Sequence, residues 1–285
     1  MKFFIFSLIM LTNIFPVFSQ NNPIRIVTLN GPITETVFAL GKGNSVVGCD
    51  TSSVYPEKTN VLPKIGYQRT LSTEGILSLK PDLIIGTDEA GPPEVLEQLK
   101  NAGLKVEILS SKPGVEPSLE RILNLGKIIN KNQEAQTLVK EIRSKLANIE
   151  KEKRKDTTFP KILFLYSRGQ HLAHVSGTST AADTMIQLAG GKNAITEFSG
   201  FKPLTPEAVI SSAPDLILIP SRGFESLGGT TGLLALPGVS ETPAGKNKRI
   251  IQIDDLILLG FGPRFVNGIE DIRKELISFK KVLKK

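Results

Sequence analysis

The sequence contains few of the residues that form disulfides and metal centres. It has one cysteine, Cys49, two histidines, His171 and His174, and no tryptophan. A single cysteine excludes an internal disulfide, and its position well inside the chain excludes a lipid-anchored N-terminal cysteine. Two histidines three residues apart do not supply the roughly three or four His and carboxylate ligands of a zinc or manganese site. We therefore expect the stability of the protein to come from its hydrophobic core.

Catalytic motifs are also absent from the sequence. Neither a nucleophile elbow nor a Ser-His-Asp order stands out. The glycine-rich segments Gly41-Lys42-Gly43 and Gly190-Gly191-Lys192 lack P-loop spacing and fall at the ends of predicted helices, where glycine is an ordinary cap. Because no acid, base and nucleophile converge, we expect a protein that is not an enzyme.

The only long apolar run in the sequence is at the N-terminus. There, Lys2 precedes the apolar stretch Phe3–Phe18 and the small residue Ser19, which predicts a secretory signal peptide at 1–19 and cleavage before Gln20. The remaining 266 residues contain no apolar segment of the roughly 20 residues that span a bilayer. The mature chain is thus expected in the periplasm, not spanning the membrane, with one large or two medium domains.

The net charge of +7 is spread along the chain. Its densest run, Lys151–Lys155, contains Glu152 and is typical of the C-terminal end of a helix, where cations offset the helix dipole. The charge therefore does not indicate a nucleic-acid partner.

An internal repeat divides the chain into two halves. Leu71–Thr87 reads LSTEGILSLKPDLIIGT, and Leu204–Pro220 reads LTPEAVISSAPDLILIP. In each, a helix of about two turns ends at a Pro-Asp pair, and the Leu/Ile run that follows is typical of a strand buried on both faces. Upstream, Gly31–Asn44 and Gly177–Asn193 each show helical spacing of apolar residues and a glycine-rich end. The repeat predicts two related α/β lobes.

Short apolar runs alternate with helical segments in both halves. They predict strands at Arg25–Leu29, Ser45–Cys49, Leu83–Gly86, Lys105–Leu109, Lys161–Tyr166, Leu216–Ile219 and Arg249–Ile253. This alternation is typical of mainly parallel sheets, so the predicted fold class is α/β with two Rossmann-like lobes.

Two helices are predicted between the halves, at Pro117–Ile129 and from Gln133 to about Lys153. At 1.5 Å per residue the second spans roughly 30 Å, enough to bridge two lobes. A helical bridge resists bending, so we expect only a modest closing motion. The predicted division is an N-terminal α/β lobe at 20–116, linking helices at 117–155 and a C-terminal α/β lobe at 156–285.

Three segments carry a resemblance to a known family. They are PKIGYQRTLSTEGILSLKPDL at Pro63–Leu83, GTSTAADTMIQLAGG at Gly177–Gly191 and LPGVSETPAGKNKRIIQIDDLILLGFGP at Leu236–Pro263. With the rest of the mature chain they resemble the periplasmic binding proteins whose lobes are joined by one long helix, which serve importers of cobalamin, iron-siderophores and haem. The haem branch fits best.

The resemblance implies a monomeric carrier that captures ferric haem between its lobes. The haem is cargo, not a catalytic cofactor, and is delivered to an ABC permease dimer with its ATPase subunits. A cobalamin or ferric-siderophore carrier of the same fold is the alternative. Siderophore sites usually use several arginines and aromatics, whereas this chain has only three tyrosines, which favours haem.

The tripeptide Tyr67-Gln68-Arg69 is the most diagnostic part of the resemblance, which implies that Tyr67 is the haem-iron ligand. A phenolate is a hard anionic ligand that stabilises ferric iron. Arg69 is placed to donate a hydrogen bond to the phenolate and to lower its pKa. From the residues alone, Tyr67 with Arg69 stacked on it is also typical of an ordinary half-buried loop.

The second lobe offers supporting candidates in the loop after its first strand. His171 is the better histidine for the cleft, since His174 leads into the next helix. Related sequences often have histidine where this one has Arg168. Arg168 and Arg222 are candidates for pairing with haem propionates, because a guanidinium binds a carboxylate in bidentate fashion.

Two glutamates occupy equivalent positions in the repeat. Glu74 and Glu207 each follow a predicted N-cap, Ser72 or Thr205, by two residues. A carboxylate in the first turn of a helix offsets the helix dipole and needs no further role. The resemblance adds a second interpretation, in which the two glutamates dock on arginines of the two-fold permease.

Overall fold

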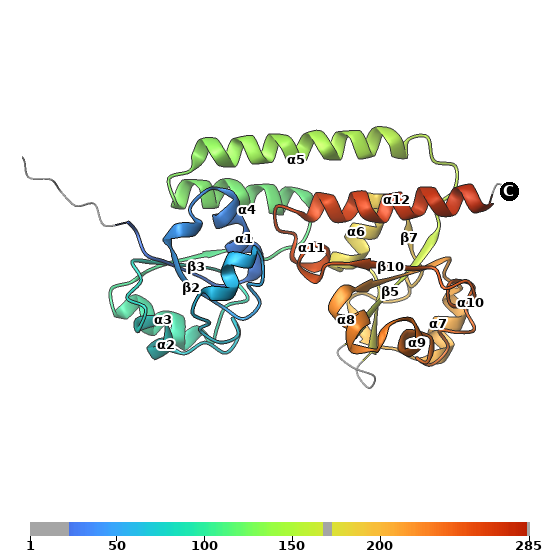
Figure 1. Cartoon of the computed structure of the whole chain (residues 1–285), viewed down its shortest axis with the longest axis horizontal. Helices are drawn as coiled ribbons and strands as arrows, with labels where there is room; N and C mark the ends of the chain where they lie inside the picture. Colours follow the sequence, from blue (N-terminus) through green and yellow to red (C-terminus); the bar gives the residue numbers. More distant parts are fainter. Residues whose placement is uncertain (1–22, 168–172, 284–285) are drawn as a thin grey trace, which may run out of the picture.

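The computed structural model describes residues 23–167 and 173–283. The predicted signal peptide at 1–19 and the candidates Arg168 and His171 lie outside these residues. The chain forms two α/β lobes side by side, with one long helix running along both (Figure 1). Within the described residues, no helix combines the length and the apolar character needed to cross a membrane.

The first lobe contains a four-stranded parallel sheet in the order β2-β1-β3-β4. Its strands are β1 Ile26–Thr28, β2 Val46–Cys49, β3 Leu83–Thr87 and β4 Lys105–Leu109, and its helices are α1 Gly31–Ala39, α2 Thr73–Leu77 and α3 Pro93–Asn101. All five residues of β3 are buried, as the unbroken apolar run predicts. The four strand predictions for this half are confirmed to within one residue at each end.

The second lobe contains a sheet in the order β10-β9-β5-β6-β8, with the short β7 also paired to β5. Its strands are β5 Lys161–Ser167, β6 Ala173–Ser176, β7 Lys192–Asn193, β8 Phe201–Pro203, β9 Leu216–Pro220 and β10 Ile250–Ile253. Strands β10, β9 and β5 are parallel as predicted, but β6 runs antiparallel to both β5 and β8. This antiparallel extension was not predicted because β8 has three residues, all exposed, and so has no apolar run.

Short helices cover the second lobe. They are α6 Ala181–Ala189, α7 Pro206–Ser212, α8 Ser221–Ser226, α9 Gly229–Leu234, α10 Pro243–Lys246 and α11 Asp255–Gly260.

The helix α5 Asn132–Lys153 connects the lobes, and it packs on α4 Val115–Ile128 beside the first lobe and on the C-terminal α12 Phe265–Leu283 beside the second (Figure 1). The predicted bounds of α4 and α5 are confirmed to within two residues. With 22 residues, α5 is about 33 Å long, and Figure 1 shows it along both lobes. One apolar cluster includes Ile26 of the first lobe, Ile142 of α5 and Phe164 of the second lobe. The lobes are therefore packed on a common core, although the predicted domain limits stay a prediction.

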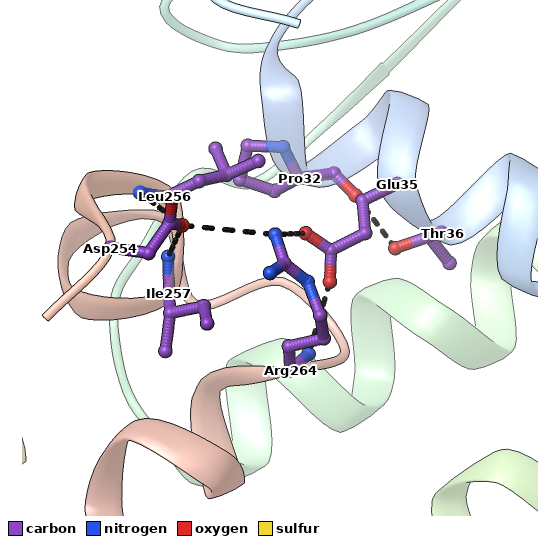
Figure 2. A network of polar contacts seen from close by, with 7 residues as sticks. All are labelled: Pro32, Glu35, Thr36, Asp254, Leu256, Ile257 and Arg264. Carbon is purple, nitrogen blue, oxygen red and sulfur yellow. Dashed lines mark hydrogen bonds and ion pairs between the residues drawn. The ribbon is translucent and has the colours of Figure 1, made fainter. Parts of the chain in front are cut away.

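An ion pair joins the lobes directly (Figure 2). Arg264, which precedes α12, donates from Nη2 to Oε2 of Glu35 on α1 at 2.9 Å and from its backbone N–H to Oε1 at 3.1 Å. The same Nη2 lies 3.8 Å from Oδ1 of Asp254, and the guanidinium carbon lies 3.4 Å from the centre of the Tyr55 ring. The Glu35 side chain is only 3% exposed, and this burial raises its pKa even though the bonds from Arg264 lower it.

A second ionic cluster holds the far end of α5 against α12. Asp156, just beyond α5, accepts a hydrogen bond from Arg273 at 2.9 Å and forms an ion pair with Lys280 at 3.1 Å. Burial alone would raise the pKa of Asp156, but these two cations together lower it below its ordinary value. The C-terminal end of α5 is thus fixed to α12 by largely buried charges.

Candidate binding cleft

A cleft of about 610 Å³ lies between the two lobes. Residues that follow β1, β2, β3 and β4 line one wall, and residues at the ends of β5, β9 and β10 line the other. The carboxyl ends of the parallel strands therefore face the cleft from both sides, which is where open α/β sheets bind ligands. The volume is within the range of roughly 300–1,000 Å³ that is usual for small-molecule sites.

Tyr67 lies on the wall formed by the first lobe, in the loop between β2 and α2. Gly66 has a φ of 91°, a conformation that suits glycine, and its carbonyl accepts the backbone N–H of Thr51 at 2.9 Å. Tyr67 closes a turn by accepting the N–H of Thr70 at 2.9 Å. Its side chain lines the cleft, and the residue is 40% exposed. A large aromatic side chain this accessible is available to a ligand.

A buried carboxylate supports the loops behind this wall. Asp50 is fully buried and accepts hydrogen bonds from the backbone N–H of Asn30 at 2.9 Å, from the hydroxyl of Ser53 at 2.6 Å, and from Ser52 through both its N–H and its hydroxyl. Asn30 has a φ of 91°, which is strained for a residue with a Cβ. Asp50 therefore holds the strained N-terminus of α1 at the edge of the cleft.

Arg69 pairs with Glu89, which lies just beyond β3. The Arg69 Nη2 atom donates to Glu89 Oε1 at 2.6 Å, and the two side chains are 55% and 36% exposed. The other carboxylate oxygen, Oε2, accepts from the amides of Gln68 at 3.3 Å and Asn30 at 3.5 Å. The predicted hydrogen bond from Arg69 to the Tyr67 phenolate stays a prediction.

The wall formed by the second lobe carries Tyr166 and Arg222. Tyr166 is near the end of β5, where it pairs in register with His174 on β6, and its ring lies 6.4 Å from the ring of Phe201. Arg222 is at the start of α8; its backbone N–H donates to Asp255 at 3.1 Å. The structure therefore brings Tyr67 and Arg222 to opposite walls of one cleft, and places Arg69 beside the first wall.

Tyr166 was not predicted as a site residue. The sequence did contain a signal for it, because Tyr166-Ser167-Arg168 repeats the Tyr-x-Arg spacing of Tyr67-Gln68-Arg69 in the other half. Asn30 and Glu89 were not predicted either, because they are 59 residues apart in the sequence and come into contact only in the folded protein.

Glu74 and Glu207 lie in the first turns of α2 and α7, and both are exposed. The predicted caps are confirmed: Ser72 accepts the N–H of Gly75 at 3.4 Å, and Thr205 accepts the N–H of Ala208 at 3.3 Å. Figure 1 shows α2 and α7 on the side of the molecule opposite α5, one in each lobe.

Comparison with known proteins gives the same fold. The family described as periplasmic binding protein matches residues 26–256. The solved periplasmic heme-binding protein RhuT from Roseiflexus sp. RS-1 is 44% identical, with a TM-score of 0.87 over 90% of this chain and 99% of that one. The periplasmic heme-binding protein HutB of Vibrio cholerae is 34% identical, with a TM-score of 0.82 over 90% and 99% of the two chains.

A curated relative has a different ligand in its name. The vitamin B12-binding protein of Vibrio vulnificus (strain CMCP6) is 27% identical over 94% of this chain and 95% of its own.

Proposed function

Since the chain belongs to the periplasmic binding protein family, we propose that it is the haem-binding member of an ABC importer and that its cargo is ferric haem. Its relatives are substrate-binding transport proteins with an extracytoplasmic location, not enzymes. We propose haem because the exposed side chain of Tyr67 lines the cleft between the lobes.

Tyr67 is the proposed axial ligand. Ferric haem has an open coordination position, and a phenolate oxygen stabilises the ferric state that persists in an oxidising compartment. Arg222, across the cleft, has a side chain suited to a propionate carboxylate, and Arg168 and His171 are proposed as further contacts from the second lobe. Arg69 is proposed to donate to the phenolate.

Vitamin B12 is the second candidate, supported by the name of the Vibrio vulnificus relative. The identities favour haem, because the haem-binding RhuT and HutB are 44% and 34% identical to this chain and the vitamin B12-binding protein is 27% identical. Haem is therefore the preferred ligand.

Delivery is proposed to use the surface opposite α5. Glu74 and Glu207 present one carboxylate from each lobe, which suits the two equivalent subunits of a permease dimer. We propose that the protein is exported by the signal peptide at 1–19 and acts as a periplasmic monomer with the domain limits predicted above.

Parallel titrations with ferric haem and with cyanocobalamin test this function. The mature protein should show a saturable Soret shift with a tyrosinate charge-transfer band, and no heat of binding for cyanocobalamin at the same concentration. Saturable binding of cyanocobalamin, with no Soret shift on addition of haem, would show that the ligand is the corrin and not haem.

A further inference from the structure

Glu89 fastens the loop that carries Tyr67 to the first-lobe sheet. Its Oε1 atom accepts Nη2 of Arg69 at 2.6 Å, and its Oε2 atom accepts the side-chain amide of Gln68 at 3.3 Å. The backbone repeats this connection, since Gly91 donates its N–H to the Gln68 carbonyl at 2.8 Å and accepts the N–H of Leu71 at 2.9 Å. Gln68 and Arg69, the two residues that follow Tyr67, are thus held by one carboxylate.

The two oxygens of Glu89 have different surroundings. Oε2 faces the amides of Gln68 and Asn30, which are 4% and 8% exposed and whose own carbonyl oxygens have no partner among the described residues. These amides rely on Oε2, because a buried donor without an acceptor is costly. Oε1 faces the half-exposed Arg69, and an exposed ion pair of this kind contributes little to stability. The main effect of the Arg69–Glu89 contact is therefore to fix the position of the guanidinium.

An arginine side chain has five N–H donors in a planar fork. The bond to Glu89 uses one of them, and within the described part of the chain Arg69 makes no other hydrogen bond. A fork held at one nitrogen loses less freedom when its remaining donors meet a ligand, because part of its rotamer freedom is already lost.

We propose that Glu89 is a positioning residue for ligand binding: it holds Arg69 by one nitrogen so that the remaining donors can reach the phenolate oxygen of Tyr67 once that oxygen ligates iron. This inference rests on the proposed function and adds a residue that the resemblance did not provide. Glu89 acts through Arg69 and does not itself contact the iron.

A double-mutant cycle tests the inference. Glu89→Gln keeps a carbonyl oxygen for the buried amides but removes the charge that holds Arg69. We expect Glu89→Gln to weaken ferric haem binding about three- to tenfold in the unmodified background, roughly 0.7–1.4 kcal/mol. In an Arg69→Ala background the same change should alter the dissociation constant less than twofold. The charge-transfer band of Glu89→Gln should also move toward that of Arg69→Ala.

The control is Glu94→Gln, which removes an exposed carboxylate on α3 and should change neither affinity nor band. Equal losses in both backgrounds would show that Glu89 acts independently of Arg69 and would overturn the inference. Unchanged or tighter binding by Glu89→Gln would overturn it too. If the unmodified protein does not bind haem, the proposed function and this inference are both overturned. If it binds haem but the effects of Glu89→Gln and Arg69→Ala on the dissociation constant are additive, only the inference is overturned.

Discussion

In the first lobe, Asp82 accepts the backbone N–H of Arg25 at 2.8 Å, and in the second lobe Asp215 accepts the backbone N–H of Lys161 at 2.8 Å. Each aspartate belongs to the Pro-Asp pair between a capped helix and a buried strand. The helix–strand frameworks of the two lobes therefore share even this individual hydrogen bond. Each wall of the cleft carries a tyrosine, Tyr67 or Tyr166, but the surroundings of the two do not repeat. The first wall has two buried amides around one carboxylate, and the second has an arginine and an antiparallel extension.

This difference separates two requirements. Docking on a two-fold partner needs the same group at the same place in each lobe, whereas a ligand held by one axial bond needs an asymmetric site. We therefore expect mutations in the repeated framework to act equally in the two lobes, and mutations in the cleft to act unequally.

The largest effect is expected at the repeated glutamates. The proposed docking predicts that Glu74→Lys with Glu207→Lys reduces haem uptake to background in cells that carry the cognate permease, because like charges would face the permease arginines that the resemblance implies. Haem titration and the melting temperature should stay nearly unchanged. The matched control is Glu120→Lys with Glu141→Lys, the same charge change at exposed positions of α4 and α5. Normal uptake by the Glu74/Glu207 variant would leave these residues only their helix-dipole role.

The next effect concerns the ion pair that joins the lobes. Arg264→Met leaves the Glu35 carboxylate buried without its cation, which should lower the free energy of unfolding by about 3 kcal/mol at neutral pH. Burial already raises the pKa of Glu35 above its ordinary 4.5, so the stability that this group contributes is present below that pH and is lost as pH rises through the folded value. Loss of Arg264 raises the folded pKa further.

Urea denaturation from pH 4 to pH 8 measures this. The deficit of Arg264→Met should be small at the acid end and should grow with pH. Arg143→Met, which breaks the exposed pair with Glu116, is the control and should change the midpoint little at any pH. A deficit that shrinks as pH rises would contradict the role of Glu35.

The two cleft tyrosines should differ. Tyr67→Phe should abolish the charge-transfer band and weaken ferric haem binding by at least about tenfold, or roughly 1.4 kcal/mol. Tyr166→Phe, on the opposite wall, should leave the band in place and change the affinity less. Absorption titrations of both variants check this, and loss of the band in Tyr166→Phe alone would move the axial ligand to the second lobe.

The repeated aspartates should have equal effects. Asp82→Ala and Asp215→Ala each remove one acceptor for a backbone N–H, at a cost of about 1 kcal/mol. Thermal denaturation should therefore show similar shifts for the two variants and none for Asp271→Ala, which removes an exposed carboxylate on α12. A shift confined to one lobe would show that the frameworks are not energetically equivalent.

The sequence predicted those parts of the fold in which burial leaves a local pattern. Strands such as β3 and β9 are buried along their whole length, so they are unbroken apolar runs. Strand β8 has no such run. The helix α12 was not predicted, although Phe265, Ile269, Ile272 and Leu276 follow helical spacing and are fully buried.

The same distinction applies to the site. Tyr67 was found through its neighbours in sequence, whereas Glu89 meets Arg69 and Asn30 only after folding. Where Arg69 points depends on that contact, so spacing alone could not place its guanidinium.

The smallest effect is expected in the overall shape. The α5 helix is about 33 Å long, and its buried residues belong to the same apolar cluster as residues of both lobes. A hinge rotation would have to bend this helix or break the Glu35–Arg264 contact. Small-angle X-ray scattering should therefore give nearly the same radius of gyration with and without haem. Lys140→Gly with Glu141→Gly, at exposed positions in the middle of α5, weakens the helix by about 1 kcal/mol per residue and provides the flexible comparison. A contraction of several ångströms in the unmodified protein, as large as in the glycine variant, would show that α5 does not hold the lobes apart.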